Sequence, residues 1–216
     1  MVQSTQHQMI LMQIILMCCP LQITSTSAPP RTPIPTPLPL LLERVIHVEP
    51  DGNCGFRTLA LAQTGYENQW RTIRSELLNH LRARSPLFLH LWGKDQFIRK
   101  SAALDFFHTP APRRNWFSAQ DMAVVAADLY QRLVVVLGGT LPGCVICLPY
   151  RAEGFTPSLI VMVHVNDNHF NMGVMNHFRL PLLDPVWLSH LEDFPDLLPI
   201  FEMLRERVSA WAHFIN

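Results

Sequence analysis

A single cysteine stands in the stretch EPDGNCGFRTLA, Glu49 to Ala60, directly behind three residues that favour turns. The apolar run that follows has a helical pattern, so this residue, Cys54, would lie at the N-terminus of a helix. A thiol attacks as the thiolate, and the unpaired N–H groups and partial positive charge of a helix N-terminus favour that form. The same amides could hold an oxyanion, and Gly52 lets the backbone approach a substrate. The stretch suits a nucleophile beside an oxyanion hole, although a buried structural cysteine after a turn fits these residues equally well.

A thiol nucleophile needs a base, and among the ten histidines His169 has a suitable setting. It follows the polar turn VNDN, Val165 to Asn168, and begins a run typical of a strand, so its ring would lie at one end of a sheet. Strand alternation sends His169 and Asn171 to one face and His164 to the other. Asn171 could therefore orient the imidazole, as the third member of a catalytic triad does. The alternative is a surface histidine in a hairpin.

The elements that would position these residues fall into two groups along the chain. Helical patterns cover residues 55–63, 68–81, 95–107 and 118–132. The last begins with Ser118 as an expected N-cap and Asp121 in its first turn. Runs typical of strands cover residues 133–138, 144–149, 159–165 and 169–175, and an extended segment covers residues 44–50. A closing helix is expected over residues 196–211. Helices followed by strands predict an α+β domain with helices packed around a small central sheet.

Residues 1–42 differ from the rest of the chain. Arg31 is their only formally charged side chain, and six prolines lie between Pro29 and Pro39. This composition predicts a disordered, proline-rich leader before a folded domain over residues 43–216. The apolar run Met9 to Cys19 is too short to span a bilayer, and no Lys or Arg precedes it as in a signal peptide. We therefore expect a cytoplasmic or nuclear protein, with secretion as the alternative.

The composition limits the partners that the domain could have. Seventeen basic side chains balance seventeen acidic ones among 216 residues, without a basic cluster, so a nucleic-acid partner is not expected. Five cysteines, an odd number, do not indicate a disulfide framework. Cys144 and Cys147 form a CxxC, but no second pair completes a zinc site, and they are predicted to pack as small apolar residues. No metal, cofactor or membrane partner is expected, and the protein should be a monomer.

Two motifs carry a resemblance to a known family. DGNCGFR, Asp51 to Arg57, resembles the nucleophile motif D-G-x-C-x-[FY]-[RH] of the OTU (ovarian tumour) family of cysteine proteases. NHFNMGV, Asn168 to Val174, resembles that family's histidine motif, in which an aromatic residue and then Asp or Asn follow the histidine. The resemblance covers about residues 45–190. The stretch LPLLDPVWLSHL, residues 180–191, is similar to the tail of OTU-like domains carried by Mutator-like transposons and related mobile elements.

The resemblance implies a papain-like OTU domain with deubiquitinase activity, which hydrolyses isopeptide bonds to ubiquitin or a ubiquitin-like modifier. It implies that Cys54 is the nucleophile, that His169 is the general base and later the general acid, and that Asn171 orients the ring. In some members the aspartate three residues before the cysteine, here Asp51, is the third member instead.

The oxyanion hole would be formed by backbone amides of the segment Asp51, Gly52, Asn53 and Cys54. The chain departs from the family pattern in two places. Gly55 stands where many members have a large apolar residue, and the orienting residue, Asn171, is neutral. His169 therefore lacks a charged partner unless Asp51 supplies one.

Two other hypotheses stay open. One is a catalytically inactive OTU-fold module that binds ubiquitin and derives from a mobile element. The intact Cys54, His169 and Asn171 favour the enzyme over this module. The other is a nucleic-acid-binding transposon protein, which the neutral charge disfavours.

Overall fold

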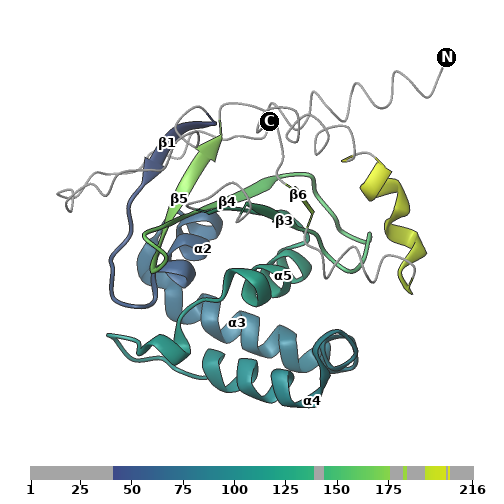
Figure 1. Ribbon diagram of the computed structural model, residues 1–216, viewed down its shortest axis with the longest axis horizontal. Coiled ribbons are helices and arrows are strands. Elements are labelled where there is room, and N and C mark those ends of the chain that lie inside the picture. The colour runs from purple at the N-terminus through teal and green to yellow at the C-terminus, as the bar shows by residue number, and fades with distance from the viewer. Residues whose placement is uncertain (1–40, 139–143, 176–181, 184–192, 203, 205–216) are drawn as a thin grey trace.

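A computed structural model of the protein describes residues 41–138, 144–175, 182–183, 193–202 and 204 (Figure 1). These residues form a mixed six-stranded sheet of order β1-β5-β4-β2-β3-β6. The four α-helices between residues 54 and 130 lie together below this sheet in the view of Figure 1. The predicted α+β class is confirmed.

The strands are β1 (Leu42–Ile46), β2 (Leu133–Leu137), β3 (Val145–Cys147), β4 (Leu159–Val165), β5 (His169–Met175) and β6 (Leu182–Leu183). β4 and β5 form the predicted antiparallel hairpin, in which Val165 pairs with His169 across the turn. β2 runs parallel to β4 and antiparallel to β3. Leu41 and Leu42, at the beginning of β1, are buried.

The helices are α2 (Cys54–Thr64), α3 (Trp70–Ala83), α4 (Ser85–Leu104) and α5 (Ala119–Tyr130). Short 3-10 turns cover Glu67–Gln69 (η2), Arg113–Asn115 (η3) and Pro195–Leu197 (η6). α4 begins at Ser85, well before the expected residue 95, and Gly93 interrupts it with φ 74° and ψ 167°. Only Phe88 and Leu104 of α4 are fully buried, so the helix lacks the apolar periodicity from which a longer helix could be predicted.

The ends of two expected helices differ from the sequence analysis. Ser118 is the N-cap residue of α5 as predicted, but its side chain makes no cap hydrogen bond to the backbone. Its hydroxyl instead donates a hydrogen bond to the carboxylate of Asp121 at 2.8 Å. The closing helix expected over residues 196–211 lies largely outside the described residues, which are helical over 198–202 after η6.

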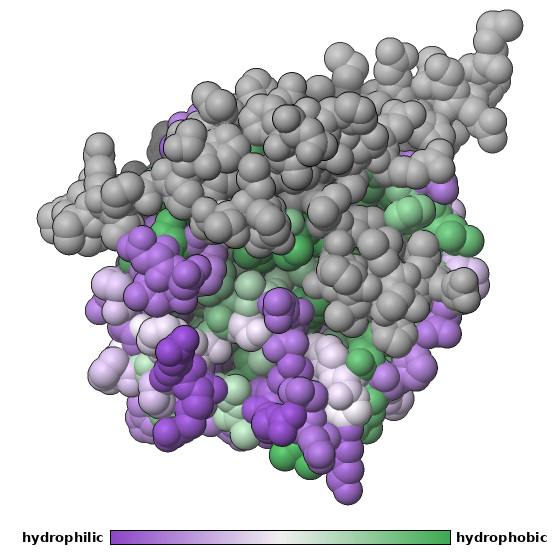
Figure 2. All heavy atoms as spheres, in the orientation of Figure 1, coloured by the Kyte–Doolittle hydropathy of each residue, from purple (hydrophilic) through white to green (hydrophobic). Residues whose placement is uncertain are grey.

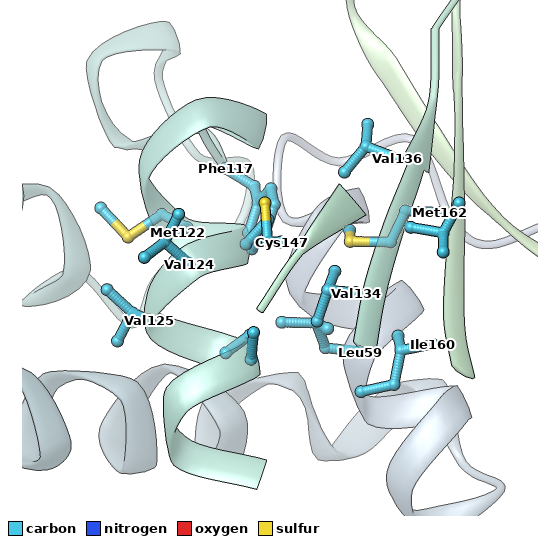
Figure 3. Close-up of a cluster of buried hydrophobic side chains, with 14 of the residues drawn as sticks. Leu59, Phe117, Met122, Val124, Val125, Val134, Val136, Cys147, Ile160 and Met162 are labelled. Atoms are coloured by element: carbon cyan, nitrogen blue, oxygen red, sulfur yellow. The ribbon is translucent and has the colours of Figure 1, made fainter. Parts of the chain in front are cut away.

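The apolar core lies between α5, α2 and the sheet (Figure 3). It is built by Val124 and Val125 of α5, Leu59 of α2, Val134 and Val136 of β2, and Ile160 and Met162 of β4. Cys147 is fully buried in this cluster, and no disulfide joins the cysteines among the described residues. This core fixes α2 against the sheet, and α2 carries the cysteine of interest at its first residue.

Candidate active site

Cys54 is the first residue of α2, as predicted, and is 6% exposed. Its sulfur lies beside the first residues of β5. These residues precede Met172, the point at which β5 begins to pair with β1. There the backbone N–H of Phe170 donates a hydrogen bond to Sγ of Cys54, with an N···S distance of 3.4 Å. The thiol therefore contacts the residue that directly follows His169.

The side chain of Asn171 is hydrogen-bonded to the ring of His169. Nε2 of His169 lies 3.0 Å from Oδ1 of Asn171, and the Val48 amide donates to the same oxygen at 3.4 Å. Because a backbone amide can only donate, this contact sets the orientation of the Asn171 side chain, so that its oxygen faces the imidazole. Nε2 must then carry the ring proton, and Nδ1 is the nitrogen that can accept one.

The imidazole of His169 is kept neutral. Burial lowers its pKa below the ordinary value, and the nearby His47 and His164 lower it further. The hydrogen bond to Asn171 and the charge of Asp51 act in the opposite direction but do not outweigh burial. At neutral pH His169 is therefore in the form that a general base requires.

The thiol of Cys54 departs from the expectation for a helix N-terminus. Burial raises its pKa, and the negative charge of Asp51 acts in the same direction. Hydrogen bonds from the amides of Phe170 and Gly55 act to lower the pKa but do not outweigh burial. Burial therefore opposes the effect that a helix N-terminus has on a thiol, and the sequence shows the helix end but not how deeply the sulfur is buried.

Asp51 is not bonded to His169. Its carboxylate accepts hydrogen bonds from Nη2 of Arg57 at 2.8 Å, from the hydroxyl of Thr109 at 2.7 Å and from the amide of Asn53 at 2.8 Å. Burial acts to raise the pKa of Asp51, but these hydrogen bonds outweigh it and hold the pKa far below the usual range. Asp51 therefore braces the loop before Cys54.

One of the expected oxyanion amides is already engaged. The N–H of Asn53 donates to Asp51 at 2.8 Å, so this amide is not free to face a substrate, and the predicted oxyanion hole at residues 51–54 stays a prediction. Within the described part of the chain, the amides of Gly52 and Cys54 bind no acceptor oxygen. Gly52 has φ 81°, and a Cβ there would collide with the Ala111 carbonyl, so a glycine is required to bring this backbone into place.

A buried arginine forms a second support for the same loop. Arg74 on α3 is fully buried, and its Nε donates to Oδ1 of Asn53 at 3.1 Å. Its Nη2 donates to the carbonyl of Asn115 at 2.6 Å, and its guanidinium lies 3.7 Å from the centre of the Phe56 ring. Burial lowers the pKa of Arg74 to about 10, so the side chain stays charged at neutral pH.

A cavity of about 160 Å³ opens beside the thiol. Its walls are formed by Cys54, Trp116, Phe117, His164 and Phe170, together with Ala119, Asp167 and Asn168. Two of these lining residues are in contact, because the ring of His164 stacks on that of Phe170 at 4.4 Å between ring centres. The aromatic walls were not predicted, because Trp116 and Phe117 reach the thiol through the tertiary fold.

The glycine that departs from the family pattern has a packing role. A Cβ on Gly55 would overlap the side chain of Phe117, so glycine lets this ring pack directly against the first turn of α2. The Phe117 ring contacts Phe56 and Phe170 edge-on, at 5.3 and 5.5 Å between ring centres. Phe117 therefore packs against both α2, through Phe56, and β5, through Phe170.

Two further observations bear on possible partners. None of the helices in the described ranges is long and apolar enough to cross a membrane. The described side chains include no group of three or more His, Cys, Asp or Glu residues placed to hold a metal ion.

Comparison with known proteins gives limited similarity. No protein-family model and no curated protein matches the chain. Among solved structures, it is similar to the OTU domain of OTUD1, with a TM-score of 0.46, 16% identity, and coverage of 60% of this chain and 84% of that one. It is similar to the viral OTU domain protease of Dera Ghazi Khan virus with a TM-score of 0.46 and 11% identity, over 62% of this chain and 81% of that one. It is also similar to the Hazara virus OTU bound to ubiquitin, with a TM-score of 0.40 and 14% identity, over 62% of this chain and 82% of that one.

These structures are OTU domains, but scores and identities this low do not assign the chain to a family. None of them concerns a mobile element, so the transposon-related resemblance of residues 180–191 stays a prediction.

Proposed function

We propose that the chain is an OTU-type cysteine protease that hydrolyses isopeptide bonds to ubiquitin or a ubiquitin-like modifier. The observation that carries this proposal is the contact series Asn171–His169 at 3.0 Å and Phe170–Cys54 at 3.4 Å. These contacts support the proposal, because His169, whose ring is bonded to Asn171, directly precedes Phe170, whose amide contacts the thiol. The choice of modifier rests on the resemblance of the motifs at residues 51–57 and 168–174 to the OTU family.

The proposed reaction begins with transfer of the Cys54 proton to Nδ1 of His169. The sulfur then attacks the isopeptide carbonyl, and the oxyanion is held by the amides of Gly52 and Cys54. The imidazolium returns its proton to the leaving lysine amine as the C–N bond breaks, which leaves a thioester on Cys54. Water, activated by His169, hydrolyses the thioester and restores the thiol.

In this scheme Asn171 is a positioning residue. It holds the imidazole and keeps the proton on Nε2, so that Nδ1 can act as the base. Asp51, Arg57 and Arg74 are also positioning residues, because they fix the loop whose amides face the oxyanion.

A ubiquitin-binding module without catalysis is a second candidate. Burial of Cys54 and the raised pKa of its thiol favour this alternative, because a protonated and enclosed sulfur is a poor nucleophile. The two candidates differ in turnover, whereas both require binding of ubiquitin.

Hydrolysis of a fluorogenic ubiquitin C-terminal amide by the full chain distinguishes them. The enzyme hypothesis predicts turnover that Cys54→Ala abolishes while ubiquitin binding persists. Cys144→Ala is the matched control and should leave turnover unchanged. Saturable ubiquitin binding by a parent protein without turnover would support the module, and absence of both activities would refute both candidates.

A further inference from the structure

A second and larger hollow adjoins the cavity at Cys54. It has a volume of about 520 Å³ and is formed by α4, η3 and the beginning of α5. Trp116 and Phe117 line both this groove and the cavity at the thiol, so the two are neighbours. Figure 1 draws α4 at the lower edge of the molecule, and Figure 2 shows hydrophilic side chains interspersed with hydrophobic ones over this lower part. A ligand in the groove would lie next to the proposed reaction centre.

The groove carries a local surplus of positive charge. Arg99, Arg113 and Arg114 line it and are exposed, and the ion pairs among the described residues do not include them. Asp121 is the acidic residue of the lining, and its carboxylate lies 2.5 Å from Nζ of Lys100. Because this pair neutralises itself, the three arginines define the charge of the groove.

The arginines lie on two separate elements. Arg99 is on α4, and Arg113 and Arg114 are on η3. Trp116, Phe117 and Met122 also line the groove and add apolar surface to it. A groove of this kind offers planar cationic donors that match carboxylates, together with apolar contacts for neighbouring side chains.

We propose that this groove binds an acidic peptide segment of the protein substrate. That this peptide belongs to a substrate rests on the proposed function, whereas the binding of an acidic peptide by the groove does not depend on it. The chain as a whole has balanced charge, and three arginines together with this apolar surface form a local site rather than the extended basic surface that nucleic acids require.

Binding is tested with the full chain carrying Cys54→Ala, so that no turnover interferes. The probe is a short fluorescein-labelled peptide rich in Glu, and the comparison peptide has Gln at each Glu position. Fluorescence anisotropy should show binding of the Glu peptide that weakens with added salt. Arg113→Glu combined with Arg114→Glu should weaken it by about tenfold or more, because two charge-assisted contacts become repulsive.

Arg151→Glu provides the matched control. Arg151 is exposed and follows Tyr150, whose amide bonds to Asp128 near the C-terminal end of α5, whereas the groove adjoins the N-terminal end. This change should leave the affinity for the Glu peptide unaltered. Equal affinity for the Glu and Gln peptides would overturn the proposal, as would tighter binding of a single-stranded oligonucleotide of equal charge.

A kinetic measurement connects the groove to the active site. Ubiquitin is joined through an isopeptide bond to a lysine within the Glu peptide or within the Gln peptide. The parent protein should show a lower KM for the Glu substrate, and the double arginine variant should remove this difference without lowering the rate on the fluorogenic ubiquitin amide. Equal KM values in the parent would overturn the inference for the substrate. If no ubiquitin substrate is cleaved, the proposed function fails. The peptide-binding assay then still tests whether the groove binds an acidic peptide.

Discussion

The side chain of Asn171 contacts the ring of His169 at 3.0 Å, and the carboxylate of Asp51 makes no such contact. The two residues that could complete a catalytic triad therefore have different positions. Asn171 determines which nitrogen of the imidazole is protonated, and Asp51 supports the loop in front of the thiol. This division predicts different kinetic consequences for their loss.

Removing the amide of Asn171 should slow catalysis. Asn171→Ala is expected to lower kcat by on the order of tenfold to a thousandfold with little change in KM, because the ring loses its orientation and its preferred tautomer. Measurement of kcat and KM on a fluorogenic ubiquitin amide checks this. Full activity of Asn171→Ala together with an inactive Asp51→Ala would show that Asp51 is the third member.

A carboxylate at position 171 should change the pH dependence. The base must be neutral, so activity falls as the pH drops through the pKa of His169, which burial places below its ordinary value of about 6.5. Asn171→Asp adds a negative charge beside the ring, which raises this pKa and moves the acidic limb of kcat/KM to higher pH. The variant should keep or exceed the parent's activity above that limb. An unchanged limb would mean that His169 is not the titrating base.

Loss of Asp51 should affect the oxyanion site. Asp51→Ala releases the amide of Asn53 and the side chains of Arg57 and Thr109, so the loop loses its fixed shape. Peptide aldehydes that mimic the oxyanion should bind to this variant less tightly. Asp105→Ala, which removes an exposed ion pair with Arg82, is the control. Unaltered aldehyde affinity in Asp51→Ala would argue against a bracing role.

The packing of Phe117 on Gly55 should make these positions interdependent. Gly55→Leu alone is expected to destabilise the protein, because the new side chain overlaps the ring of Phe117. Combining Gly55→Leu with Phe117→Ala should recover part of the lost thermal stability, which a double-mutant cycle of Tm values would measure. Strictly additive effects would show that the two side chains do not share this space.

Asp128 should stabilise the fold in a pH-dependent manner. This fully buried residue lies 2.8 Å from Nε2 of His80 and 2.7 Å from Nη1 of Arg84. Burial acts to raise its pKa, but hydrogen bonds from His80 and the Tyr150 amide, with the charge of Arg84, outweigh it and leave the pKa lowered. Asp128→Asn should cost about 3 kcal/mol at neutral pH, because it removes the buried carboxylate that binds the guanidinium of Arg84, the ring of His80 and the amide of Tyr150.

The sign of the pH effect follows from the lowered pKa. The contribution of Asp128 is present above the unfolded-state pKa of about 3.9 and is lost as the pH falls through the folded-state value. The difference in Tm between parent and Asp128→Asn should therefore shrink below about pH 4. Asp105→Asn, at an exposed pair, should show a much smaller difference at neutral pH. A difference that does not vary with pH would contradict this assignment.

The parts of the fold that depend on local pattern could be predicted from the sequence. Strands β4 and β5 and the turn between them agree with the sequence analysis, because alternation and turn residues define them locally. The same alternation placed Asn171 beside His169. The longer extent of α4 could not be predicted, because a surface helix with a break at Gly93 has no continuous apolar stripe.

The parts of the site that depend on tertiary contacts could not be predicted. The engagement of the Asn53 amide by Asp51, and the closure of the cavity by Trp116 and Phe117, require segments far apart in the chain to meet. The raised pKa of Cys54 likewise follows from burial, and the residues that mark the start of a helix do not reveal how deeply a side chain is buried.

The most direct test of the proposed active site is covalent capture by ubiquitin with an electrophilic C-terminus. The parent chain is incubated with the probe, and the modified residue is located by peptide mass spectrometry. A single adduct on Cys54 is predicted, formed at a rate that Asn171→Ala lowers and Cys144→Ala leaves unchanged. Failure to form an adduct in a folded protein that binds ubiquitin, or an adduct on Cys144 or Cys147 instead, would contradict a catalytic role for Cys54.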